Sequence, residues 1–155
     1  MSSPFVVDYR GVFSFPMSPC QMWHELERPD KLTGRWRWVD VLQVDPRLDP
    51  GAELSCVVTP PLPYRMALDV MVLEVSHCKL IEVEIRGDLR GRAELTLEPE
   101  GQGTLVTVAW QLEMMERRMR AAARYAHPLL RWGHDRVVEA AVRSFRRHIQ
   151  GQQSP

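Results

Sequence analysis

The stretch that decides the fold is RWGHDRVVEAAVRSFRRHI, residues 131–149. Its apolar residues recur every three or four positions, which is the periodicity of an amphipathic helix. A stripe with this spacing has to be buried against another element, so the sequence predicts a long C-terminal helix packed on a sheet. His134 lies in the middle of the stripe. With the residue that precedes the stretch included, the stripe consists of Leu130, His134, Val138, Ala141, Phe145 and Ile149.

The preceding chain supplies that sheet, because much of it alternates apolar and polar residues with a period of two. In FVVDYRGVFSFP, residues 5–16, the aromatic side chains of Tyr9, Phe13 and Phe15 share one face. Strands linked by short turns form an antiparallel sheet. Further strands are predicted in RWRWVDVLQVDP, AELSCVVTP, YRMALDVMVLEV, KLIEVEIRGD, RAELTLEP and TLVTVAWQLEM.

One or two short helices are predicted after the first strand. In MSPCQMWHELERPDKL, residues 17–32, Ser18 can cap a helix and Pro19 can occupy its first position. Pro29 either ends this helix or forces a second short turn. The predicted fold class is therefore α+β. We expect a curved antiparallel sheet of about six to seven strands wrapped around the long C-terminal helix.

Length and composition favour one globular domain. The chain has 155 residues and a mass of 17.9 kDa, and 45% of its residues are hydrophobic. We expect a single domain over residues 1–150 and a disordered tail over 151–155. Twenty basic and twenty acidic residues give zero net charge, which argues against a nucleic-acid partner. Since no run of about 18 apolar residues occurs, no transmembrane segment is predicted.

Cysteine usage and the N-terminal residues favour a cytoplasmic protein. Cys20, Cys56 and Cys78 are widely spaced, with neither a C-x-x-C pair nor the spacing of zinc ligands. We expect all three to be reduced thiols. The N-terminal MSSPFVVDYRG lacks the basic and apolar regions of a signal peptide. Neither a metal nor a cofactor is predicted.

Three stretches resemble the helix-grip (SRPBCC) superfamily of START domains, birch-pollen-allergen-like proteins and polyketide cyclases. They are FSFPMSPCQMWHEL, GDLRGRAELTLEPEGQGTLVTVAWQLE and PLLRWGHDRVVEAAVRSFRRHI, and the resemblance covers nearly the whole chain. It is strongest to the bacterial polyketide cyclase/dehydrase-like branch. The resemblance implies a deep, mostly apolar cavity between the sheet and the C-terminal helix. Members bind lipids, sterols or polyketides, and a minority catalyse aromatisation, cyclisation or dehydration, so the fold alone does not fix the function.

His134 is the candidate for chemistry. Its imidazole would face the sheet or the cavity, where it could contact a ligand oxygen or act as a general acid or base. The alternative is a core histidine whose hydrogen bonds are satisfied by a strand. Asp135 is turned by about 100° around the helix and is not expected to complete a dyad. Its expected partner is Arg131 or Arg136.

Aromatic, sulphur-containing and aliphatic side chains are expected to line the cavity. The strand register stays open for residues 65–71 and 82–88, and the favoured one turns the acidic side chains to solvent. Met71 and Met114 are counted among the lining residues. Cys56 has no neighbouring base that would make it a nucleophile. The predicted ligand-binding residues are Trp38, Cys56, Met66, Leu68, Val83, Ile85, Trp110, Leu112, Leu130, His134 and Val138.

Two functions remain open. The favoured one is a carrier or sensor, not an enzyme, that binds a lipid, polyketide or aromatic metabolite. The alternative is a polyketide aromatase/cyclase or dehydratase with His134 as acid/base and Arg86 or Tyr125 as an oxygen partner. The Arg-rich residues 115–132 could make transient membrane contact, or they are a solvated helix end. Both a monomer and a homodimer fit the sequence.

Overall fold

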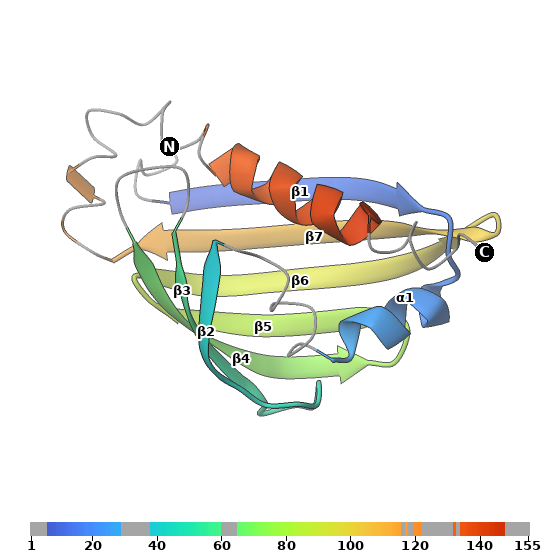
Figure 1. Ribbon diagram of the computed structural model, residues 1–155, viewed down its shortest axis with the longest axis horizontal. Helices are drawn as coiled ribbons and strands as arrows, with labels where there is room; N and C mark the ends of the chain where they lie inside the picture. Colours follow the sequence, from blue (N-terminus) through green and yellow to red (C-terminus); the bar gives the residue numbers. More distant parts are fainter. Residues whose placement is uncertain are drawn as a thin grey trace.

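The protein is a seven-stranded antiparallel sheet curved around a C-terminal helix (Figure 1). Its structure, a computed structural model, describes residues 6–28, 38–59, 65–115, 117, 120–121, 132 and 134–147. The strands are β1 (Val6–Phe15), β2 (Val39–Val44), β3 (Glu53–Val58), β4 (Met66–Ser76), β5 (Leu80–Gly87), β6 (Leu89–Glu100) and β7 (Gly103–Met114). The helix α1 spans Pro19–Leu26, and residues 134–147 form the C-terminal helix.

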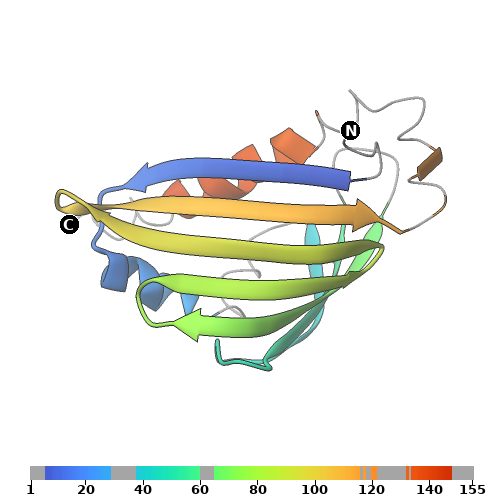
Figure 2. The same ribbon diagram turned by 180° about the vertical axis from the view of Figure 1, so that it is seen from behind.

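The strand order across the sheet is β1-β7-β6-β5-β4-β3-β2. Strands β2 to β7 are antiparallel neighbours in the order of the sequence, and β1 pairs with β7 at the other edge of the sheet. The C-terminal helix and α1 both lie on the concave face of the sheet (Figure 1). Figure 2, from behind, shows the convex face formed by the long strands. The predicted α+β helix-grip architecture is confirmed.

Strand β5 adopts the register that the sequence favoured. Ile81 packs against the hydrophobic core, and because side chains alternate along a strand, Val83 and Ile85 share its inward face. Glu84 lies on the outer face, where its Oε1 is 2.8 Å from Nε of Arg86. The outward position of the acidic side chains is therefore confirmed. The expectation that Arg86 contacts an oxygen of an enclosed ligand is wrong, because Arg86 lies on the same outer face as Glu84.

Strand β4 follows the same alternation, and this corrects one expectation. Val70 lies opposite Ile85 and therefore faces inward. Asp69 faces outward and accepts a hydrogen bond of 2.7 Å from Oγ of Ser55. Met71 is half-buried, but it is two residues from Asp69 and so shares its outer face. The expectation that Met71 lines the interior is wrong.

The predicted start of α1 is confirmed in detail. Ser18 is the N-cap residue: its Oγ accepts a hydrogen bond from the backbone N–H of Gln21, and the Gln21 side chain accepts one from the Ser18 backbone N–H. This reciprocal arrangement is a capping box, with Pro19 at the first helical position. The helix buries Met22 and Trp23 against the sheet. The position of α1 therefore determines at which end of the concave face the hydrophobic core lies.

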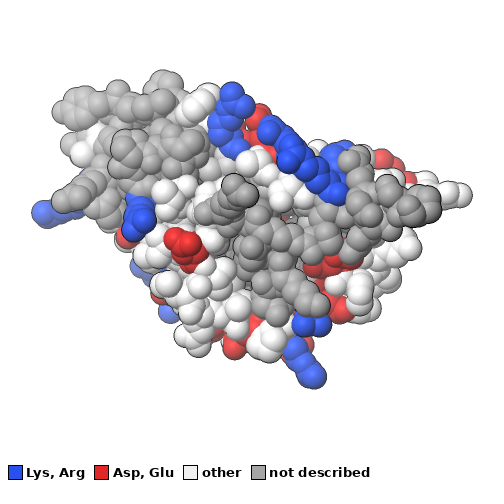
Figure 3. All heavy atoms as spheres, in the orientation of Figure 1, with Lys and Arg blue, Asp and Glu red and all other residues white. Residues whose placement is uncertain are grey.

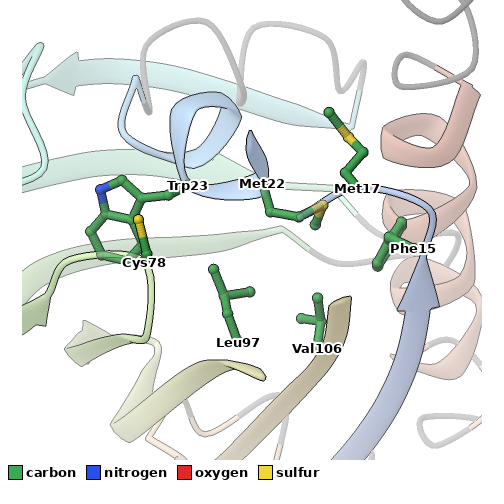
Figure 4. Packing of buried hydrophobic residues seen from close by; sticks show 7 residues of the cluster. All are labelled: Phe15, Met17, Met22, Trp23, Cys78, Leu97 and Val106. Carbon is green, nitrogen blue, oxygen red and sulfur yellow. The ribbon is translucent and has the colours of Figure 1, made fainter. Parts of the chain in front are cut away.

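The hydrophobic core lies where α1 and the C-terminal helix meet the sheet (Figure 4). Phe145 of the C-terminal helix meets Phe15 edge to face, with ring centroids 5.6 Å apart and planes at 87°. The buried hydroxyl of Thr104 donates a hydrogen bond to the carbonyl of Met17, which ties the entry to α1 to β7. The inward orientation predicted for Phe145 is confirmed. The buried members of the core are Phe15, Met17, Met22, Trp23, Cys78, Leu97 and Val106.

A disulfide joins Cys20 in α1 to Cys78 in the turn between β4 and β5. The expectation of three reduced thiols is wrong for this pair. The two residues are 58 positions apart, and only the folded sheet brings their Cα atoms to 4.8 Å, so linear spacing gave no sign of it. Cys56 is a free, buried thiol. Since disulfides are rare in reducing compartments, the cysteine argument for a cytoplasmic location no longer holds.

Several expectations fall on other parts of the chain. The role of Pro29 and the predicted tail over 151–155 lie outside the described residues, and the single domain over 1–150 stays a prediction. Within the described ranges, no helix has the length and apolar character needed to cross a membrane.

Candidate ligand site

Beyond the core, two rows of inward-facing side chains cross the sheet at the end nearest His134. Most of them are apolar but only half-buried. Because these side chains stay partly exposed, the inner face is less completely covered here than at the core. The first row is Tyr9, Trp110, Ala93, Val83 and Val72. The second row is Val7, Leu112, Gly91, Ile85, Val70 and Leu54.

Two small residues stand at the centre of these rows. Ala93 separates Val83 from Trp110 and offers only a methyl group. Gly91 separates Ile85 from Leu112 and offers no side chain at all. A Cβ on Gly91 would press on the backbone carbonyl of Gln111, so the close approach of β6 and β7 requires glycine. Because neither position carries a large side chain, the middle of the inner face is a shallow depression between larger neighbours.

The structure brings most of the predicted ligand-binding residues onto this inner face. Cys56 and Leu68 are directly opposed on β3 and β4, and Met66 lies two residues from Leu68 on the same face. Trp38 is half-buried just before β2, where its carbonyl accepts a 2.8 Å hydrogen bond from the Thr59 N–H. Val138 is half-buried on the C-terminal helix and Met114 is buried at the end of β7, whereas Leu130 and Tyr125 lie outside the described residues.

His134 connects the C-terminal helix to the sheet through Trp110. Nε1 of Trp110 is 3.0 Å from Nε2 of His134. Tyr9 stacks on Trp110 with ring centroids 4.5 Å apart, and its ring lies 5.2 Å from the imidazole. The inward orientation of His134 is confirmed. Three aromatic rings from β1, β7 and the helix thus form one wall of the inner space.

The hydrogen bonds fix the form of the imidazole. The indole N–H of Trp110 can only donate, so Nε2 of His134 has to accept and cannot carry a proton. The proton of the neutral ring is therefore assigned to Nδ1, which lies 3.3 Å from Oδ1 of Asp135. Both nitrogens of His134 have partners. In this arrangement no lone pair of the imidazole is free to take a proton from a substrate.

The contact between His134 and Asp135 corrects the expectation that sequence neighbours on a helix do not meet. Nδ1 is the ring nitrogen nearest the backbone and the aspartate side chain is short, so both reach across the gap between adjacent positions. The pairing of Asp135 with Arg136 is also wrong, because Arg136 approaches Glu139 at 3.8 Å. Arg131, the other expected partner, lies outside the described residues. The carboxylate orients the imidazole but leaves it engaged with Trp110.

Tyr9 belongs to the site although it was not among the predicted lining residues. Its inward position followed from the alternation in β1, but its contacts depend on the pairing of β1 with β7. A Cβ at Gly11 would collide with the Tyr9 hydroxyl, so the glycine makes room for the phenol. Burial raises the pKa of Tyr9, and the carboxylates of Asp135 and Glu139 raise it further.

Cys56 is chemically quiet. Burial raises the pKa of its thiol, and the carboxylate of Asp69 adds to the effect. A protonated thiol in an apolar setting is a packing group rather than a nucleophile. Within the described part of the chain, no cluster of three or more His, Cys, Asp or Glu side chains is arranged to hold a metal ion.

Comparison with known proteins identifies the fold. No protein-family model matches the chain and no curated protein matches its sequence. TTHA0849 from Thermus thermophilus superposes with a TM-score of 0.79 at 16% identity, covering 96% of this chain and 100% of that protein. The chain has the helix-grip fold. The bacterial polyketide cyclase/dehydrase-like branch stays a prediction.

Two further structures share this fold. The di-domain ARO/CYC StfQ from the steffimycin biosynthetic pathway gives a TM-score of 0.68 at 15% identity, over 91% of this chain and 48% of StfQ. Ara h 8.0201 gives 0.53 at 12% identity, over 72% of this chain and 80% of that protein. The likeness is to the fold, so the function has to come from the residues on the inner face.

Proposed function

We propose that the protein binds a small hydrophobic molecule between the sheet and the C-terminal helix, as a carrier or sensor. The observation that carries this proposal is the partly exposed apolar inner face at the His134 end. Ligand sites in proteins are concave, mostly apolar surfaces with a few polar groups. The inner rows have this character, and the Tyr9 hydroxyl supplies a polar group at their edge.

The aromatic wall favours a ligand with planar rings. Tyr9, Trp110 and His134 pack ring against ring and stay partly exposed, and such rings pair well with further aromatic rings. An aromatic polyketide or similar metabolite therefore suits this end of the molecule better than a flexible alkyl chain. StfQ, which shares the fold, is an aromatase/cyclase by its description, and this lends support to a polyketide-like ligand.

Binding without transformation is the part of the proposal that rests on His134. A general acid or base needs a nitrogen within reach of the substrate proton. In this protein Nε2 accepts from Trp110 and Nδ1 lies against Asp135. We therefore place His134 at the ligand as a contact and as the residue that holds the helix to the sheet.

Thermal unfolding with a panel of aromatic polyketides, flavonoids and fatty acids tests the proposal. A ligand at about 100 times its dissociation constant stabilises the native state by about 2.7 kcal/mol. For a chain of this size that corresponds to a rise in Tm of about 5–10 °C. We expect the largest shifts from planar aromatic compounds.

A matched pair of substitutions locates the site. Ala93→Phe places a large side chain at the centre of the inner face, where only small residues stand. Ala109→Phe adds the same bulk on the outer face, opposite Arg10. The first variant should lose the ligand-induced shift and the second should keep it, with both folds checked by circular dichroism. No shift from any compound, or equal shifts in both variants, would overturn the proposal.

A further inference from the structure

The outer face of the C-terminal helix carries a row of cationic side chains beside an exposed tryptophan. Arg136, Arg143 and Arg147 are exposed and lie seven and four residues apart, so they project from one side of the helix. Trp132, four residues before Arg136, is 47% exposed. Figure 3 shows Lys and Arg atoms in a row over this helix, with a few acidic atoms among them. We call Trp132, Arg136, Arg143 and Arg147 the helix surface.

The net charge of the chain is zero, but its positive and negative charges are unevenly distributed along the sequence. Residues 116–147 contain nine Arg and three acidic residues, a net charge of +6. Residues 1–115 contain eleven basic and seventeen acidic residues, a net charge of −6. The helix surface therefore belongs to a basic segment on an otherwise acidic protein. This separation orients the molecule in the field of any anionic surface.

The position of Trp132 adds an apolar element to this charge. The guanidinium carbon of Arg136 lies 5.5 Å from the centroid of the Trp132 ring, a geometry that combines a cation with an aromatic face. Tryptophan is favoured at the boundary between lipid headgroups and hydrocarbon, and arginine binds phosphate oxygens. Exposed tryptophan beside arginine is thus the chemistry of an interfacial contact.

We propose that the helix surface docks on an anionic phospholipid bilayer. This inference deepens the proposed function, because a carrier that docks on a membrane can exchange a hydrophobic molecule with it. A bilayer touches only one face of the protein, so it can engage the helix surface, where Glu139 is the acidic neighbour of Arg136, without meeting the acidic side chains on the outer face of the sheet. A nucleic acid would extend past one short helix and meet that acidic surface, and this favours the membrane.

Vesicle partitioning of the full-length protein tests the inference. We expect binding to phosphatidylcholine vesicles that contain phosphatidylserine, weak binding to phosphatidylcholine alone, and loss of binding at high salt. Combining Arg136→Gln, Arg143→Gln and Arg147→Gln should lower partitioning roughly 100-fold, given the usual contribution of each basic residue at such a surface. Trp132→Phe should weaken binding less.

The chain offers a matched control. Arg10, Arg90 and Arg92 are exposed on the outer face of the sheet, and replacing all three by Gln removes the same charge elsewhere. This variant should partition within about threefold of the wild type. Equal losses in both triple variants, or equal binding to neutral vesicles, would refute a specific helix surface. Binding of an RNA oligonucleotide without binding to vesicles would refute the membrane as partner.

Failure of this inference can be told apart from failure of the proposed function. The helix variant should keep the ligand-induced rise in Tm, because its substituted residues face away from the sheet. Loss of vesicle binding with that rise intact supports the docking surface. If no ligand raises Tm but partitioning still depends on the three arginines, the docking surface stands and the proposed ligand function is wrong.

Discussion

The two ends of the concave face differ in what covers them. At one end, α1 and Phe145 close over the sheet, and Met22 is left only 1% exposed. At the other end the strands alternate in the same way, but inward residues such as Val83 and Ile85 remain half-buried. The pattern of the strands is shared, so it cannot be the cause of the difference. The placement of α1 completes the core at one end, and at the other end we propose that the partly exposed inward residues contact a ligand.

A second difference lies in how the covering elements are held. Around α1 the attachment is apolar packing reinforced by the Cys20–Cys78 disulfide. Near His134 the attachment consists of the hydrogen bond from Trp110 and the ring contacts of the imidazole with Tyr9 and Trp110. A packed and cross-linked end resists opening, whereas one hydrogen bond and a few ring contacts between partly exposed groups contribute only modestly. We expect ligand entry at the end where the helix is held by the weaker contact.

The sharpest way to break this comparison is to truncate one methionine at each end. Met22→Ala should lower the free energy of unfolding by about 4 kcal/mol, because it empties a filled core position. Met66→Ala removes the same atoms from a half-buried inner position and should cost about 1 kcal/mol. Urea denaturation measures both, and equal losses would mean that the two ends are packed alike.

Removing the disulfide is expected to have the next largest effect. The bond closes a loop between residues 58 positions apart, and loss of such a constraint typically costs about 3 kcal/mol. Cys20→Ser changes an exposed position, so the loss should come from the cross-link. Unfolding with and without a thiol reductant should show the wild type falling to the level of this variant.

Cys56→Ala supplies the control for the reductant. This variant retains the disulfide, so its stability should still fall when the reductant is added. Ligand binding by Cys20→Ser below its melting temperature should be unchanged, because the cross-link lies at the packed end. A wild type whose stability ignores the reductant would show that the cross-link does not support α1.

The fold was accessible from sequence because its determinants are local. Alternation and turn residues indicated the seven strands, Ser18 and Pro19 indicated the start of α1, and the helical stripe indicated the inward side of His134. The disulfide was not accessible, since it depends on where α1 lies relative to the turn between β4 and β5. Met71 was misplaced for a simpler reason: residue type was given more weight than strand alternation, which puts it beside Asp69 on the outer face.

The sequence predicted which residues face the candidate site, but not the hydrogen bonds that they form there. Trp110 and His134 were both expected inside, yet the hydrogen bond between them requires the register of β7 against the helix. That bond decides which nitrogen of His134 carries a proton, and so it decides whether the imidazole is available. Tyr9 was overlooked because its partner strand is about 100 residues away in the chain.

The contact between Trp110 and His134 should have a smaller effect on stability than the packed end. A double-mutant cycle with Trp110→Phe and His134→Phe should give a coupling free energy of about 1 kcal/mol, the usual net value of such a hydrogen bond. Trp132→Phe, at an exposed position, should change stability by less than about 0.5 kcal/mol. A coupling near zero would mean that the helix is held by its apolar stripe alone.

The smallest expected effect is the pH dependence of Tyr9. Burial raises the pKa of its phenol in the folded state, and Asp135 and Glu139 add to the rise. The phenol of Tyr9 therefore holds its proton more tightly in the folded than in the unfolded protein. The associated stability is fully present below the unfolded value of about 10 and is lost as the pH rises through the folded value.

Tyrosinate absorbance as a function of pH measures this shift. The difference between the wild type and Tyr9→Phe should titrate above the range of a free tyrosine, and Asp135→Asn should bring it down part of the way. Tyr9→Phe should also flatten the fall in stability at alkaline pH. An ordinary titration would place the phenol in open solvent, and the aromatic wall at the His134 end would then lack its third ring.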